Sequence, residues 1–225
     1  MTKSDFDKDQ MKQIRLGFEY GLSVEQVKIY AKPEFDILQM EQIRLGFQNG
    51  LSMEQVLFYA KPEFNAWQMH QIKLGFRNSL SIEQVKIFAE PNFTLDQMEQ
   101  IRKGFEDGLT MEQVLLYTKP EFDSNQMVEI RSGFKYKLSM EQVKLYAKFD
   151  FNHKQMEQIK NFLVENKGKS IDKLYKQIKN KTDKTKEEHL FMKAYELHIK
   201  EKMCKKIVEN IEQTLPKRPK IKMKL

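Results

Sequence analysis

A tandem repeat of 29 residues runs through the first two thirds of the chain. A phenylalanine opens each copy with no insertion or deletion between copies, at Phe6, Phe35, Phe64, Phe93, Phe122 and Phe151. Self-similarity at a fixed period of this size is typical of repeat proteins, in which each unit buries its apolar face against the next one. Such arrays usually present an extended surface to a large partner and seldom form a single reaction pocket.

Two capping signals in each copy predict two short helices. In the first copy, Asp7 with Gln10 opens one helix and Ser23 with Gln26 opens the second. In each pair the first side chain accepts from a free backbone amide of the first turn, and the glutamine reaches back to the amide of the capping residue. Helices this short are marginal in water by themselves, so we expect stacking of the copies to stabilise them.

Glycine recurs at two places in the repeat. Gly21, Gly50 and Gly108 stand where a left-handed residue is expected to end the first helix, whereas Ser79 and Lys137 replace glycine there and should cost stability. A second series lies inside the first helix, where glycine costs about 0.5–1 kcal/mol relative to alanine. We interpret this series as a close approach to a neighbouring helix; its members are Gly17, Gly46, Gly75, Gly104 and Gly133.

These patterns predict an all-α protein, a solenoid-like array of 29-residue helix-turn-helix repeats followed by a helical basic C-terminal region. Residues 1–162 would hold five two-helix repeats and a sixth half-repeat as a cap, residues 163–215 the C-terminal region, and residues 216–225 a flexible polybasic tail. Thr185 with Glu188 opens the longest predicted helix. Its expected apolar stripe is Leu190, Ala194, Leu197, Cys204, Val208, Ile211 and Leu215, which makes Cys204 a core residue.

Charge is distributed unevenly along the chain. Residues 1–150 carry 19 Lys and Arg against 22 Asp and Glu, whereas residues 151–225 carry 20 against 10. The concentrated positive charge favours contact with nucleic acid or an acidic protein, although a solvated helix face and a solubilising tail would have the same composition. The candidate nucleic-acid-binding residues are Lys202, Lys205, Lys206, Lys217, Arg218 and Lys220.

One cation per copy forms a regular series, which is Arg15, Arg44, Lys73, Arg102, Arg131 and Lys160. Such a ladder would suit a phosphate backbone. We expect instead that each cation pairs with the equally regular acidic series Glu25, Glu54, Glu83, Glu112 and Glu141, and that both series serve the stack. A third series, the glutamines Gln13, Gln42, Gln71 and Gln100, receives the same structural interpretation.

Positions that vary between copies are better candidates for partner binding. The two positions after the first cap hold large apolar residues in the second and third copies, as Ile37, Leu38 and Trp67. Tryptophan is enriched at interface hot spots, so these three residues are the candidate protein-binding anchor. Packing beneath a neighbouring loop is the alternative. A further alternation, Lys28, Leu57, Lys86, Leu115 and Lys144, is interpreted as an accident of duplication.

The chain lacks the residue patterns of an enzyme or a metalloprotein. Its four histidines are scattered, its glycines are single, and its one cysteine excludes an intramolecular disulfide and a cysteine-based metal site. We therefore predict no enzymatic activity, cofactor or metal. The sequence has no long apolar run for a membrane span and no signal-peptide core at its start. We expect a cytoplasmic protein, and the Lys, Asn and Ile bias favours a bacterial source.

The segment from Gln39 to Ser52, QMEQIRLGFQNGLS, is followed at residues 59–64 by YAKPEF. This motif resembles tandem repeats in uncharacterised proteins of Gram-positive gut bacteria and their mobile elements, and the resemblance covers residues 1–162. The resemblance brings no assigned activity, but the mobile-element setting implies an accessory or anti-defence role.

The leading functional hypothesis is a non-enzymatic repeat scaffold that docks a protein or nucleoprotein partner. The alternative is a nucleic-acid-binding protein, for RNA or DNA, that uses the basic C-terminal helix and tail. The sequence leaves the partner's identity and the oligomeric state open.

Overall fold

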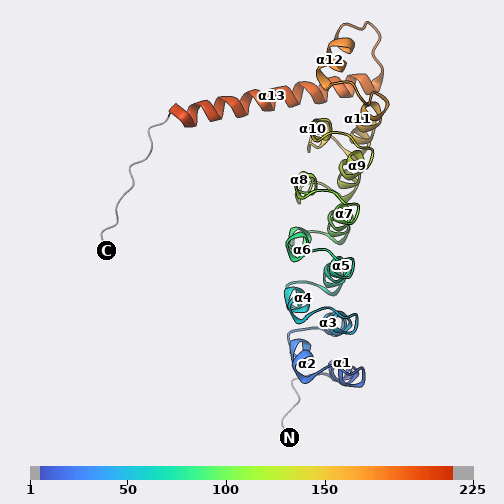
Figure 1. Ribbon diagram of the computed structural model, residues 1–225, viewed down its shortest axis with the longest axis vertical. Coiled ribbons are helices and arrows are strands. Elements are labelled where there is room, and N and C mark those ends of the chain that lie inside the picture. Colours follow the sequence, from blue (N-terminus) through green and yellow to red (C-terminus); the bar gives the residue numbers. More distant parts are fainter. Residues whose placement is uncertain (1–5, 215–225) are drawn as a thin grey trace, which may run out of the picture. The chain divides into compact units, whose positions relative to one another are not determined.

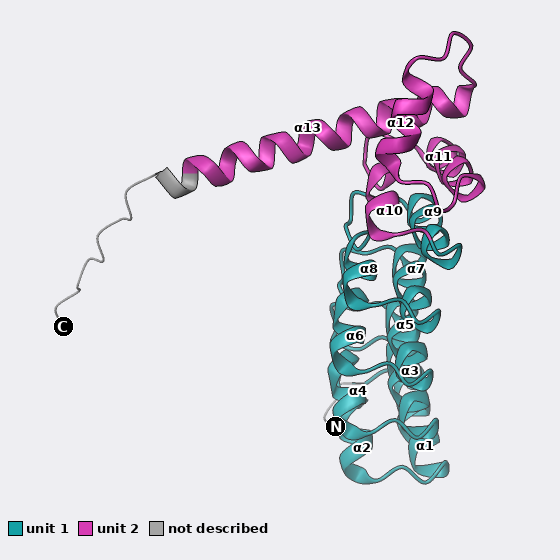
Figure 2. Cartoon of the chain, turned by 45° about the horizontal axis from the view of Figure 1, so that its top comes forward, with its two compact units in different colours: residues 1–137 teal, residues 138–225 magenta. Residues whose placement is uncertain are grey.

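The computed structural model describes residues 6–214, with side chains up to residue 211. The described residues form thirteen helices and no strand, so the protein is all-α as predicted. They group into two compact units, Met1–Lys137 (unit 1) and Leu138–Leu225 (unit 2), which Figure 2 colours separately. The candidate residues Lys217, Arg218 and Lys220 lie outside the described residues.

Unit 1 consists of alternating long and short helices, with the long ones in one row and the short ones in another (Figure 1). The long helices are α1 (Lys8–Glu19), α3 (Ile37–Gln48), α5 (Ala66–Arg77), α7 (Leu95–Glu106) and α9 (Ser124–Lys135). The short helices are α2 (Val24–Tyr30), α4 (Met53–Tyr59), α6 (Ile82–Phe88) and α8 (Met111–Leu115). Each long helix packs against the next long helix, so every copy supplies part of the core of its neighbour.

The capping signals form as the sequence predicts. In α1 the Asp7 carboxylate accepts from the amide of Gln10 at 2.7 Å, and Gln10 Oε1 accepts from the amide of Asp7 at 3.0 Å. Every other helix of unit 1 begins with the same reciprocal pair. Ser79 (φ 63°) and Lys137 (φ 61°) adopt the left-handed conformation expected of glycine. The packing of the repeat therefore imposes this turn even on side chains that disfavour it.

The core of unit 1 repeats with the sequence. Met40 and Ile43 of α3 are fully buried, and Tyr59 of α4 closes the space between α3 and α4. The long helix of the first copy differs, because among the described residues no copy precedes α1. Met11 and Phe18 are exposed there.

Unit 2 consists of α10 (Met140–Tyr146), α11 (His153–Glu165), α12 (Ile171–Lys179) and α13 (Lys186–Thr214). The other three helices of the unit all pack against α13. Phe191 and Ala194 are buried there, and Tyr195 stacks on Tyr175 with ring centroids 4.1 Å apart. An ion pair between Lys148 and Glu201 ties α13 to the segment that follows α10.

The compact units divide inside the fifth repeat, with α9 in unit 1 and α10 in unit 2. The predicted boundary at residue 162 marks the end of the sequence repeat and stays a prediction. The expected apolar stripe of α13 is buried at Ala194, but the prediction that Cys204 is a core residue is wrong. Cys204 and Val208 are exposed. The buried side of α13 contains Phe191, Ala194 and His198, and the residues further along that same side of the helix are charged.

Candidate binding surfaces

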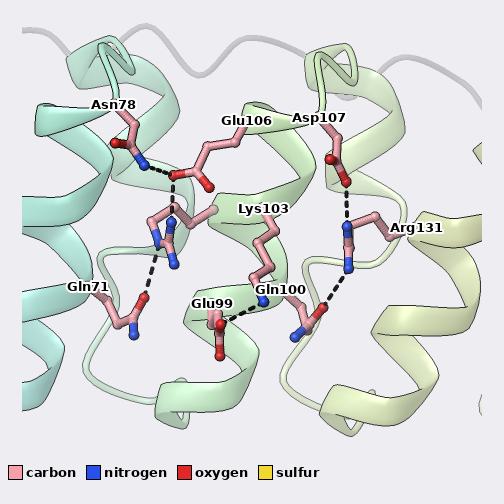
Figure 3. A network of polar contacts seen from close by, with 9 residues as sticks. Gln71, Asn78, Glu99, Gln100, Lys103, Glu106, Asp107 and Arg131 are labelled. Atoms are coloured by element: carbon pink, nitrogen blue, oxygen red, sulfur yellow. Dashed lines mark hydrogen bonds and ion pairs between the residues drawn. The ribbon is translucent and has the colours of Figure 1, made fainter. Parts of the chain in front are cut away.

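From the second copy onwards, the cation series of unit 1 lies inside the stack and pairs with glutamines. Arg44 Nε donates to Gln13 Oε1 at 3.0 Å, and Lys73 Nζ donates to Gln42 Oε1 at 2.6 Å. The same bond joins Arg102 to Gln71. It also joins Arg131 to Gln100 (Figure 3). Each bond crosses from one copy to the preceding one, so the structural interpretation is supported.

The expected acidic partners of these cations are wrong. Arg102 pairs with Glu106 one turn along α7. Arg131 pairs with Asp107 (Figure 3). The predicted partners Glu25 and Glu83 are exposed in the first turn of the short helices, where hydrogen bonds to their own backbone amide and to the capping serine lower the pKa of each carboxyl. A carboxylate there complements the positive end of the helix dipole instead of the buried cation.

Burial keeps these cations away from a phosphate backbone. Arg44, Lys73 and Arg102 are all buried, and burial, together with the charges of Arg77 and Arg44, lowers the pKa of Lys73 to about 8. Phosphate contacts need cations that can reach the solvent. In the described part of unit 1, this series holds adjacent copies together. Arg15 is exposed in the first copy, where no copy precedes it.

Sequence reasoning missed a second role of the capping glutamines. Gln39 Nε2 donates to the carbonyls of Phe64 (2.7 Å) and Pro62 (3.2 Å) in the next copy, while its Oε1 caps α3 at the amide of Asp36. Gln10, Gln68 and Gln97 make the same three bonds. The sequence did contain a signal for this second role, because every copy has glutamine at this capping position. Glutamate would cap the helix equally well, but only glutamine can also donate a hydrogen bond.

The predicted protein-binding anchor lies on the surface of unit 1. Trp67 in the first turn of α5 is 65% exposed and Leu38 in the first turn of α3 is 49% exposed, while Ile37 beside it is half-buried. Leu38 and Trp67 occupy equivalent positions of adjacent copies whose helices pack together. We call Ile37, Leu38 and Trp67 the Trp67 patch. The structure therefore places these residues at the surface, as anchoring requires.

Acidic residues stand at the two ends of this patch. The position held by Leu38 and Trp67 is occupied by Asp9 in the preceding copy and by Asp96 in the following one, and both are exposed. The exposed surface formed by the first turns of these long helices thus has an apolar centre between two carboxylates.

The short helices expose a second apolar surface, to which sequence reasoning gave no role. Leu57 of α4 and Leu115 of α8 are each 46% exposed, and Met53 and Met111 lie one turn before them. We call these four residues the short-helix face. The intervening helix α6 presents Lys86 at the equivalent position, so apolar bulk alternates with positive charge.

The basic candidates of unit 2 lie on the second half of α13. Lys202, Lys205 and Lys206 are exposed. Lys202 Nζ lies 2.9 Å from Glu141 Oε1 of α10, so part of its charge is already neutralised within the unit. Lys205 and Lys206 point their charge to solvent and are the stronger candidates of the three.

Among residues 6–214, no group of three or more His, Cys, Asp and Glu side chains is arranged to hold a metal ion. None of the helices in this range is long and apolar enough to cross a membrane. Comparison of the chain with protein-family models, with curated proteins and with solved structures found no significant match.

Proposed function

We propose that the protein is a non-enzymatic, solenoid-like repeat scaffold that docks a protein or nucleoprotein partner through the Trp67 patch. The observation that carries the proposal is the exposure of Trp67 and Leu38 at a position that is polar in the other copies. Large apolar side chains on a rigid helical frame lose little conformational freedom on binding and are typical interface anchors.

The surroundings of the patch indicate the chemistry of the partner. Asp9 and Asp96 border the apolar centre, so a complementary surface would have an apolar hollow to receive Trp67 and basic groups on either side. Such rim charges would speed association and select against acidic surfaces more than they would add affinity.

A scaffold of this kind suits the mobile-element setting that the sequence resemblance implies. An accessory or anti-defence protein that masks a host assembly needs an extended binding surface and no reaction pocket. The interior of unit 1 is consistent with a scaffold, because its buried Gln–cation hydrogen bonds hold adjacent copies together.

The test is an affinity purification of the tagged full chain from a bacterial host lysate, with and without nuclease. A protein that stays bound after nuclease is then titrated against wild type and Trp67→Ala. We expect the substitution to weaken binding by about 10–100-fold, the usual cost of removing a hot-spot tryptophan.

Phe149→Ala is the matched control, because Phe149 is also an exposed aromatic residue but lies in unit 2. It should leave the affinity unchanged. Equal affinities for wild type and Trp67→Ala would refute the Trp67 patch as the anchor.

Exposure of Lys205 and Lys206 favours one alternative, a nucleic-acid-binding protein that uses the basic helix and the tail residues Lys217, Arg218 and Lys220. Each neutralised phosphate releases counterions, so the affinity for RNA or DNA would fall steeply with salt. Replacing Lys205 and Lys206 by glutamine should then reduce the slope of log affinity against log salt. A slope near zero in the wild-type chain would exclude this alternative.

A further inference from the structure

The first copy keeps, on its surface, the residues that stacking buries in the other copies. Phe18 is 49% exposed and Met11 is exposed as well, whereas the equivalent residues of the second copy, Phe47 and Met40, are buried. Arg15 is also exposed and has no hydrogen bond or ion pair among the described residues. Terminal repeats that face solvent usually carry polar residues on their outer side. The first copy has no such substitution at these positions, so we call Met11, Arg15 and Phe18 the α1 face and examine what would cover it.

The fifth copy shows which side chains hold the cation of such a face. Arg131, the equivalent of Arg15, donates from Nη2 to Gln100 Oε1 at 3.2 Å and forms an ion pair with Asp107 (Figure 3). Gln100 lies on α7 of the preceding copy, and Asp107 is the residue that caps the end of the same helix. The cation is thus bound by an amide oxygen and a carboxylate seven residues apart on one long helix.

The sixth copy carries the same two groups at the same positions of its own long helix, α11. Gln158 is the equivalent of Gln100, and Glu165 is the equivalent of Asp107. Neither has a hydrogen bond or an ion pair among the described residues. We call Gln158 and Glu165 the α11 pair. Both line an open hollow of about 480 Å³ in unit 2, together with Asn161, Phe162, Thr185, Glu187 and Glu188.

We infer that the α1 face of one copy of the chain docks on the α11 pair of a second copy. Arg15 donates to Gln158 and pairs with Glu165, in the way that Arg131 binds Gln100 and Asp107 inside the chain. A second copy is the occupant because the chain holds both unused halves of a contact that recurs between its own repeats. The carboxylates that line the hollow complement the charge of the arginine.

This contact joins two different surfaces, so it is heterologous. Each molecule uses its α1 face on one neighbour and offers its α11 pair to another, which makes the association head-to-tail. Pairing of two like surfaces about a two-fold axis would instead use the same residues on both molecules. The two arrangements therefore respond differently when only one of the two surfaces is changed.

The first test is sedimentation equilibrium of the full chain from micromolar to sub-millimolar concentration. We expect the apparent mass to rise with concentration above the monomer value of 26.9 kDa. Arg15→Ala and Glu165→Lys should each weaken self-association by about 30-fold or more, the usual result of removing one partner from a charge pair that docking buries. Both residues are exposed, so the helical circular dichroism spectrum should not change.

Lys28→Ala is the matched control for Arg15→Ala. It removes the same charge from the same copy, at a position that stays exposed in α4, α6 and α8. This variant should self-associate like wild type.

Mixing the two defective variants tests the head-to-tail arrangement. Arg15→Ala keeps an intact α11 pair, and Glu165→Lys keeps an intact α1 face, so an equimolar mixture should form a one-to-one complex with the affinity of wild type and grow no further. A charge exchange in one chain, Arg15→Glu with Glu165→Lys, should restore the self-association that Glu165→Lys alone removes.

Three results would overturn the inference. A wild-type chain that stays monomeric at every concentration would refute docking between copies. Self-association of Glu165→Lys at the wild-type level would show that the α11 pair is not used. A mixture of Arg15→Ala and Glu165→Lys that stays monomeric would exclude the head-to-tail contact. Trp67→Ala should self-associate like wild type, so failure here and failure of the Trp67 patch are distinguishable.

Discussion

The glycines inside the long helices make room for the ring of the following short helix. In the second copy, the hydroxyl of Tyr59 donates to the carbonyl of Gln42 at 3.3 Å, directly beside Gly46. A Cβ at Gly46 would lie 2.0 Å from Tyr59 Oη. In the third copy the equivalent ring is Phe88, which lacks a hydroxyl, and a Cβ at Gly75 would lie 2.8 Å from Phe88 Cζ.

This difference predicts unequal costs for the same substitution. Gly46→Ala should lower the free energy of unfolding by about 2 kcal/mol, because the buried ring must move and its hydrogen bond breaks. Gly75→Ala should cost less, since the overlap is smaller and alanine favours the helix. Urea unfolding followed by circular dichroism measures both values.

The double variant Gly46→Ala with Tyr59→Phe provides the control. Removing the hydroxyl makes the second copy resemble the third, so the cost of Gly46→Ala should fall towards that of Gly75→Ala. Equal costs for Gly46→Ala in the presence and absence of the Tyr59 hydroxyl would contradict this explanation.

At the scale of the element, the capping glutamine of each long helix also fastens the next copy. Gln39→Glu keeps the oxygen that caps α3 but sets a carboxylate against the carbonyls of Phe64 and Pro62, which then lose their donor. We expect the free energy of unfolding to fall by about 2–3 kcal/mol, the scale for an unsatisfied buried polar group. Chemical denaturation gives this value directly.

Gln55→Glu is the matched change in a short helix. Gln55 Oε1 caps α4 at the amide of Ser52 at 2.9 Å, and among the described residues its amide nitrogen donates to no other copy. This variant should unfold within about 0.5 kcal/mol of wild type, as most partly exposed substitutions do. A loss as large as that of Gln39→Glu would show that capping, and not the bond between copies, carries the effect.

The capping residues also show which features could be predicted from the sequence alone. Asp7 with Gln10 predicts where α1 begins, because capping is a local interaction over three residues. The bond from Gln10 to the carbonyl of Phe35 was not predictable, since it depends on how two copies stack. Cys204 shows the same limit, because helical spacing gives the members of an apolar face but not the side of α13 that its neighbours cover.

For the candidate surfaces, the sequence identified Trp67 and Leu38 from their departure from the repeat, and they are exposed. It gave no role to Leu57 and Leu115, because their exposure follows from packing of the short helices and not from their local sequence. The sequence has one acidic residue per cation in each repeat, which led us to expect ion pairs between them. In the structure the cations donate to glutamines instead.

At the scale of the whole molecule, each unit contains a histidine whose pKa is lowered by its surroundings. Burial lowers the pKa of His198 in unit 2, and the charges of Lys202 and Lys148 lower it further, although Glu141 and Glu201 oppose them. His198 Nε2 is buried without a hydrogen-bond partner among the described residues. Burial and the charges of Lys73, Arg102 and Arg77 likewise lower the pKa of His70 in unit 1.

A lowered pKa in the folded state means that the unfolded chain takes up the proton first as the pH falls. The stability that depends on a neutral histidine is therefore complete above the ordinary histidine pKa of about 6.5 and declines as the pH falls through the lower folded value. Each unit should lose stability as the pH falls below about 6.5, before the carboxylates titrate.

Replacing one histidine should remove the acid-dependent loss of stability from the unit that contains it and leave the other unit unchanged. Native-state hydrogen exchange, read by mass spectrometry and corrected for the intrinsic effect of pH, follows peptides of α7 for unit 1 and of α13 for unit 2. We expect His198→Gln to remove much of the acid sensitivity of α13 and leave that of α7, and His70→Gln to do the reverse. If either substitution changed both units equally, the chain would open as one cooperative body and the two units would not respond independently.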